Sequence, residues 1–171
     1  MPYYKITICT LALWILCCAN ARAQDSLSWP MRYEIDVTRH FSLVTGYHFW
    51  KRHFAELGVA VNEYGRKGRH PITKAYYVSS EIKFDDKLLI GPKVGCWFGG
   101  GLALGASLIY YTDFSVAALR LRPEIGSGFE NWRIMYGYNI PLTNRGFQGI
   151  NKSHVSIVFM FGLKKLKTIR K

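Results

Sequence analysis

The best candidates for catalysis in this chain of 171 residues are a histidine and a serine two positions apart, His154 and Ser156. Alternate residues of a β-strand point to the same face, so this spacing places an imidazole beside a hydroxyl, as a general base and a nucleophile would be. No acidic residue follows His154, so Glu124 would have to orient the imidazole from another strand. The pair indicates either a nucleophilic site or two hydrogen-bonding side chains on one face.

Two basic segments are candidates for binding anions. The chain has 23 Lys and Arg against 11 Asp and Glu, a formal net charge of +12. Such an excess attracts anionic surfaces and ligands, although it also serves plain solubility. One segment contains Arg66, Lys67 and Arg69, and the other is the C-terminal tail, residues 164–171.

Residues 1–23 have the pattern of a cleavable signal peptide. Lys5 precedes an apolar core, Ile6–Ala19, and Ala21-Arg22-Ala23 supplies a small-x-small cleavage site. Only Cys96 lies outside this leader, so no internal disulfide is expected. The sequence has no Cys/His spacing typical of metal sites and no glycine-rich phosphate loop, and we expect neither a metal nor a cofactor.

Apolar and polar residues alternate with period two along most of the remaining chain, which predicts β-strands with two unlike faces. Apolar residues keep to the same alternate positions from Met31 to Val61, so one of the boundaries between strands that we assign in this range is misplaced. We therefore predict eight strands, with ten as the alternative. The nine alternating segments are Met31–Val37, Phe41–Phe49, Leu57–Val61, Tyr76–Phe84, Leu88–Phe98, Leu102–Tyr110, Leu119–Ile125, Trp132–Ile140 and Val155–Leu163.

The polar face of these segments combines glycines with charges of both signs, which suits the interior of a narrow closed sheet. Buried charges persist only when they are paired, so we expect a charge network, a filled interior and no sizeable pore. Lys93 and Glu124 occupy equivalent places in a weak repeat and are expected to pair. The charged residues of this face are Arg32, Glu34, Asp36, Glu56, Glu81, Lys83, Lys93, Arg120, Arg122, Glu124 and Arg133.

Two other folds fit parts of the pattern. A soluble, lipocalin-like carrier in the periplasm would have the same alternation with the faces inverted. Residues Val94–Thr112 carry no charge and contain Gly101-x-x-x-Gly105, as a transmembrane helix would. Three consecutive glycines, Gly99–Gly101, interrupt that segment and favour a hairpin instead.

Taken with the segments Tyr136–Leu142 and Gly146–His154, the leader and the alternation resemble the small outer-membrane β-barrel proteins of Gram-negative bacteria. The resemblance implies an all-β fold, a closed antiparallel up-and-down transmembrane β-barrel, located in the outer membrane. It implies a monomer that contacts membrane lipids and lipopolysaccharide, does not bind nucleic acid, and has a non-enzymatic role in envelope integrity or surface interaction. The expected organisation is a signal peptide (1–23), a barrel (24–163) and a basic tail (164–171).

His154-Val155-Ser156 also resembles the His-x-Ser motif of outer-membrane lipid A deacylases. Those enzymes continue the motif with Asn, whereas Ile157 follows here. This resemblance makes a lipid A-modifying enzyme the alternative function. Both side chains, however, point toward the expected lumen and away from a lipid substrate.

Overall fold

β-Strands make up most of the residues that the computed structural model describes, which are 35–67, 70–83 and 88–170. The predicted signal peptide and the candidates Arg32, Glu34 and Arg69 lie outside these ranges. The strands are β1 (Ile35–Phe49), β2 (Phe54–Lys67), β3 (His70–Lys83), β4 (Leu89–Gly99), β5 (Gly101–Thr112), β6 (Ala117–Gly128), β7 (Trp132–Tyr138), β8 (Ile140–Pro141) and β9 (Ser153–Arg170).

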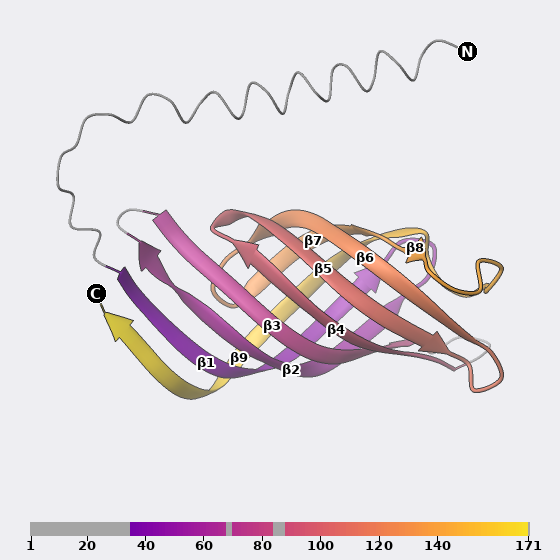
Figure 1. Cartoon of the computed structure of the whole chain (residues 1–171), viewed down its shortest axis with the longest axis horizontal. Coiled ribbons are helices and arrows are strands. Elements are labelled where there is room, and N and C mark those ends of the chain that lie inside the picture. The colour runs from indigo at the N-terminus through magenta and orange to yellow at the C-terminus, as the bar shows by residue number, and fades with distance from the viewer. Residues whose placement is uncertain (1–34, 68–69, 84–87, 171) are drawn as a thin grey trace, which may run out of the picture. The chain divides into compact units, whose positions relative to one another are not determined.

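These strands form one antiparallel sheet that returns to its starting strand (Figure 1). Each of β1 to β6 pairs with the next strand along the chain, and β9 pairs with both β7 and β1. The two residues of β8 prolong β7 along β6, through the pairs Leu121–Ile140 and Arg120–Pro141. The sheet therefore rings through eight strands, as the alternation predicted, and the alternative of ten strands is wrong.

Two predicted boundaries differ from the structure. Met31–Val37 and Phe41–Phe49 were predicted as separate segments, but residues from both belong to β1. The two segments have apolar residues at the same alternate positions because alternation continues unchanged along a single strand. Residues 164–170 were assigned to a tail, but they continue β9 and pair with β1 as far as Asp36–Arg170.

The connections at the two ends of the ring differ in length. At one end, here called the terminal end, lie the start of β1, the end of β9 and the tight turns near Gly100 and Asn131. The opposite end, here called the loop end, carries the β1–β2, β3–β4 and β5–β6 connections and residues 142–152 before β9. In Figure 1 the end of β9 lies at the left and β8 at the right.

The side chains inside the ring form three layers. Nearest the loop end is an apolar cluster of Phe54, Leu89, Ile109 and Tyr111. Next to this cluster lies a layer of buried charged side chains, which includes Glu56, Glu81, Lys93 and Arg122. Below them lies a second apolar cluster, made of Val44, Ala60, Ala75, Tyr77, Trp97, Ala103, Met135, Val158 and Met160.

Glycines give the large inward side chains the space that they need. A Cβ at Gly91 would lie 2.7 Å from the Tyr111 ring, and one at Gly137 would lie 2.5 Å from the His154 ring. Real carbon atoms do not approach so closely. Glycine at these inward positions is therefore a condition for placing Tyr111 and His154 inside.

Residues 94–112, considered above as a helix, form parts of β4 and β5 and the turn between them. Gly100 N–H donates to the Leu102 carbonyl at 3.1 Å, and Gly101 adopts a φ of +111°, which favours glycine. No helix in the described ranges is long and apolar enough to cross a membrane.

Candidate functional site

Glu81 is the centre of the charge network inside the ring. It is fully buried on β3, and Arg122 on β6 binds both of its carboxylate oxygens, with Arg122 Nη2 donating to Oε2 at 3.0 Å. Lys93 Nζ on β4 lies 3.0 Å from Oε1, and the Tyr111 hydroxyl on β5 donates to Oε2. One carboxylate thus receives donors from three other strands, which offsets its desolvation.

Glu56 on β2 is the second buried carboxylate. Lys93 Nζ lies 2.8 Å from its Oε1 and so bridges Glu56 and Glu81. The Ser79 hydroxyl donates to Oε1 at 2.5 Å, and His48 Nε2 lies 2.7 Å from Oε2. The expected Lys93–Glu124 pair is not the ion pair that forms, because Lys93 is held between these two nearer glutamates.

Glu124 on β6 has different neighbours. The Tyr77 hydroxyl donates to its Oε2 at 3.3 Å, and His154 Nε2 lies 3.9 Å from Oε1. Arg133 on β7 stacks its guanidinium over the rings of Tyr77, at 4.6 Å, and Trp97, at 5.5 Å. In the part of the network nearer the terminal end, the cation Arg133 is therefore held by cation–π contacts.

The network continues into the connection at the loop end. Arg122 Nε donates to Asn139 Oδ1 at 2.8 Å, and Asn139 Nδ2 donates to the Asn151 carbonyl at 2.7 Å. The interior ion pairs and the fold of residues 142–152 are therefore joined through one buried amide side chain.

His48, Glu56 and Glu81 are the residues in the described ranges whose arrangement comes nearest to a metal site. Their potential ligand atoms all lie within 4.8 Å of one another. The Lys93 ammonium group, however, already bridges the two carboxylates, and a divalent cation would add positive charge to a group that is already neutralised. We conclude that this cluster is built around Lys93 and does not fit a metal ion.

The catalytic candidates His154 and Ser156 both point into the ring, where each is 1% exposed. The Ser156 hydroxyl donates to the Met135 carbonyl at 3.4 Å, and neither ring nitrogen of His154 has a hydrogen-bond partner in the described structure. Instead, the His154 ring lies 5.2 Å from the His48 ring. The arrangement provides neither a base bonded to the hydroxyl nor a route for a substrate.

The other predicted residues lie nearer the ends of the ring. Lys83 and Arg120 are buried on inward positions close to the loop end, and Arg120 donates to the Thr143 and Asn144 carbonyls. Asp36 is exposed at the terminal end of β1. Of the basic segment, Arg66 is exposed on β2 and Lys67 ends that strand.

Uncharged side chains that join the network but were not predicted include His48, Tyr77, Ser79, Tyr111 and Asn139. Each lies on the polar face of an alternating segment or continues that face, so the alternation did contain the signal. A search limited to Lys, Arg, Asp and Glu missed them.

No protein-family model matches the sequence, and comparisons with curated proteins and with solved structures find no match either.

Proposed function

We propose that this protein is a closed β-barrel of a bacterial outer membrane, with a plugged and charge-paired lumen. Its proposed role is non-enzymatic, in envelope integrity or in surface interaction through its loops. The observation that carries the proposal is the inverted polarity of the ring, which buries its ion pairs and exposes its apolar side chains. In water this arrangement is unfavourable, whereas in lipid it is the stable one.

The outward face of β4 to β7 supports contact with lipid, because its residues carry no charge. Val94 is 53% exposed and Leu104 is also 53% exposed, values unusual for such residues on a water-soluble sheet. Large apolar side chains exposed on this outer belt include Leu57, Val59, Tyr76, Val78, Val94, Phe98, Leu104, Leu108, Tyr110, Leu121, Ile125, Ile134, Tyr136, Phe159 and Phe161.

A row of charges supports one boundary of that belt. Arg39, Glu63 and Lys74 are paired across β1, β2 and β3 and point outward near the terminal end. Lys74 Nζ lies 3.1 Å from Glu63 Oε2, and Arg39 Nε donates to Glu63 Oε1 at 2.6 Å. Charged side chains of this kind belong in the headgroup region or in water, so we place the lipid boundary before this row.

Aromatic side chains at both edges of the belt support the same placement. Tyr47, Tyr110 and Tyr138 are exposed toward the loop end, whereas Phe98 and Phe129 are exposed toward the terminal end. Aromatic girdles at the two interfaces are typical of transmembrane barrels. Such barrels also have short turns and both chain ends on the periplasmic side, and longer connections on the outer side. We therefore place the loop end outside the cell.

The filled interior supports a plugged lumen. Trp97, Arg122, Arg133 and Tyr111 are among the largest fully buried side chains, and all point inward. Phe147 and Ile150 pack on the apolar cluster at the loop end. These layers leave no basis for proposing a channel.

Neither alternative is favoured by a specific observation. A soluble, lipocalin-like carrier needs a polar exterior, whereas the described outer belt exposes large apolar side chains. A lipid A-modifying enzyme would need His154 and Ser156 to face the membrane, and they point inward.

The proposal is tested by separating the envelope of the native host and running the outer-membrane fraction on SDS gels with and without boiling. A transmembrane barrel stays folded in unheated SDS and migrates faster than the boiled chain. Recovery of the protein in the periplasmic fraction, with no heat-dependent shift, would contradict the proposal.

A further inference from the structure

The connection of residues 142–152 is folded back over the loop end of the ring. Arg120 Nη1 donates to the Thr143 carbonyl at 2.9 Å, and Asn139 N–H donates to the Lys152 carbonyl at 2.8 Å. Phe147 packs between these anchors onto the apolar cluster below. Polar and apolar contacts thus hold both ends and the middle of this connection in one position.

Arg52, in the β1–β2 connection, is fixed against the same segment. Its backbone N–H donates to Asn151 Oδ1 at 3.0 Å, and Asn151 Nδ2 donates to its carbonyl at 2.7 Å. A Cβ placed on Gly149 would lie 3.8 Å from Arg52 Nη1, so the guanidinium lies beside this glycine. No carboxylate among the described residues forms an ion pair with this guanidinium.

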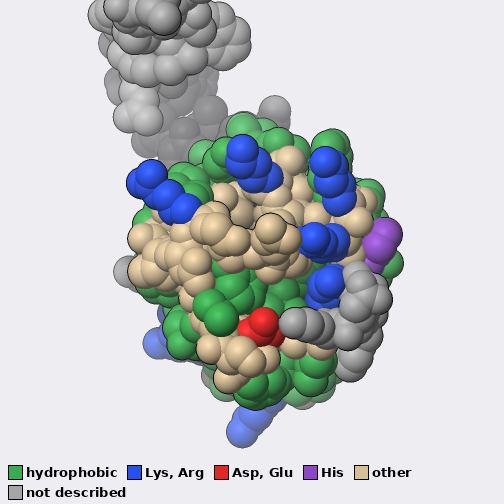
Figure 2. Space-filling model, turned by 90° about the vertical axis from the view of Figure 1, so that its right-hand side faces the viewer, with side chains coloured by type: hydrophobic (Ala, Val, Ile, Leu, Met, Phe, Trp, Pro, Cys, Tyr) green, Lys and Arg blue, Asp and Glu red, His purple; other side chains and the backbone are tan. Residues whose placement is uncertain are grey.

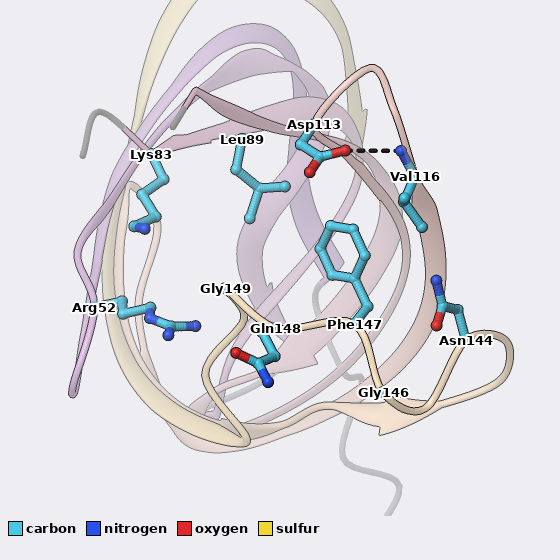
Figure 3. A pocket seen from close by; sticks show the side chains of 10 residues that line it. All are labelled: Arg52, Lys83, Leu89, Asp113, Val116, Asn144, Gly146, Phe147, Gln148 and Gly149. Carbon is cyan, nitrogen blue, oxygen red and sulfur yellow. Dashed lines mark hydrogen bonds between the residues drawn. The ribbon is translucent and has the colours of Figure 1, made fainter. Parts of the chain in front are cut away.

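Between these two connections lies a pocket with a volume of about 560 Å³, within the range that holds small ligands. Figure 3 shows Arg52 and Lys83 along one side, with Leu89 and Phe147 facing the middle. Asn144 and Gln148 add amide groups to the wall. The lining therefore combines cationic, apolar and hydrogen-bonding surfaces.

Cations outnumber acidic groups among the described residues around the pocket. Among the side chains drawn in colour in Figure 2, Lys and Arg are spread across the loop end and acidic colour appears at one place. Lys51 and Lys152 line an adjoining hollow that shares Arg52 with the pocket. Asp113, the acidic residue of the pocket lining, accepts hydrogen bonds from the N–H groups of Ser115 and Val116.

We propose that this pocket binds the phosphate group of a phosphorylated sugar, either free or as the headgroup of a glycolipid. A guanidinium fixed at its backbone, with no carboxylate partner among the described residues, is suited to two-pronged contact with phosphate oxygens. Several surrounding cations favour a multiply charged anion, and Leu89 and Phe147 offer an apolar surface to the sugar ring. This inference goes beyond the proposed function, because the pocket needs no membrane to bind its ligand.

The test is titration calorimetry of the purified protein in non-ionic detergent, with glucose 1-phosphate as the soluble probe and glucose as its uncharged comparator. Lipid A in mixed micelles, compared with its dephosphorylated form, is the glycolipid probe. We expect the phosphorylated member of each pair to bind and the other not to bind. Tighter binding of lipid A identifies a headgroup as the source, whereas equal or weaker binding identifies a free sugar phosphate.

The deciding variant is Arg52→Gln, which keeps the backbone bonds to Asn151, with Arg39→Gln at the terminal end as the matched loss of one charge. Arg52→Gln should weaken binding tenfold or more, roughly the effect of losing one charge-assisted hydrogen-bonded contact. Arg39→Gln should leave affinity unchanged, and Arg52→Lys should fall between the two. Unheated gel migration checks that each variant is folded.

Three results would overturn the proposal. They are no binding of either phosphorylated probe, equal weakening by Arg52→Gln and Arg39→Gln, and unchanged affinity in a folded Arg52→Gln variant. Equal weakening would mean that the net charge of the protein, and not this pocket, attracts the anion.

Discussion

Arg122 on β6 and Glu81 on β3 form a two-pronged ion pair across the interior of the ring, between residues 41 positions apart in the sequence. Their strands are not neighbours in the sheet. The pair therefore connects opposite parts of the ring wall, which the backbone ladder alone does not do.

Removing one partner of this pair should destabilise the protein strongly. Arg122→Met leaves Glu81 buried with less compensation, and we expect a loss of about 3–5 kcal/mol in the free energy of unfolding. Denaturant unfolding, followed by the fraction of compact species on unheated gels, measures it. Glu63→Gln on the outer surface is the control and should cost less than about 1 kcal/mol. Similar losses in both variants would show that the interior pair has no special role.

The charge row at the terminal end should make a small, pH-dependent contribution to stability. Burial alone would raise the pKa of Glu63, but hydrogen bonds from Lys74 and Arg39 outweigh it and hold the pKa below its usual value of about 4.5. Because the folded state has the lower pKa, the contribution is present above pH 4.5 and is lost as the pH falls through the folded value.

The measurement compares the unfolding midpoints of the wild-type protein and Glu63→Gln across this range. The difference should be present at neutral pH and disappear in acid. A difference that grows as the pH falls would have the wrong sign for this account.

Asn139 should control the order of the connection at the loop end. Asn139→Ala removes the side-chain bonds to Arg122 and to the Asn151 carbonyl, so residues 142–152 should detach more readily. Trypsin cleavage after the exposed Arg145 is the readout, and we expect it to be faster in the variant. Asn131→Ala in a turn at the terminal end is the control. Equal cleavage rates in all three proteins would refute the proposed link.

His154 should be dispensable for lipid chemistry. Because its side chain is enclosed within the ring, His154→Ala should leave the mass spectrum of lipid A unchanged in cells that carry the variant. Acyl chains retained only in the variant would restore the alternative of a lipid A-modifying enzyme. A normal amount of folded protein must be confirmed first, because His154 lies within the charge network.

The alternation of residue types predicted most of the strands because large apolar side chains recur along the outward face of this sheet. It failed where that condition ends. Residues 164–170 are rich in lysine and read as a tail, yet backbone pairing with β1 extends β9 through them. Backbone hydrogen bonds do not depend on side-chain type, so composition cannot reveal where such pairing stops.

The sequence could also indicate which charges face inward, but not which of them meet. Lys93 on β4 contacts Glu56 and Glu81 because the register of β2, β3 and β4 sets Glu56 opposite Glu81 and Glu81 opposite Gly91, and that register has no local signal. The loop-end pocket was not predicted either. Arg52 and Phe147 lie in connections without periodicity, and only the folded chain brings them together.

The central claim, that the outer belt faces lipid, is tested most directly by nitroxide labels on two outward positions of neighbouring strands. Val94→Cys on β4 lies in the belt, and Lys74→Cys on β3 lies in the charge row, both in a Cys96→Ser background. In lipid vesicles, we expect the label at Val94 to be accessible to oxygen and shielded from a water-soluble nickel chelate, with the opposite at Lys74. If the nickel chelate reaches both labels equally, the belt faces water and the account of a membrane barrel is wrong.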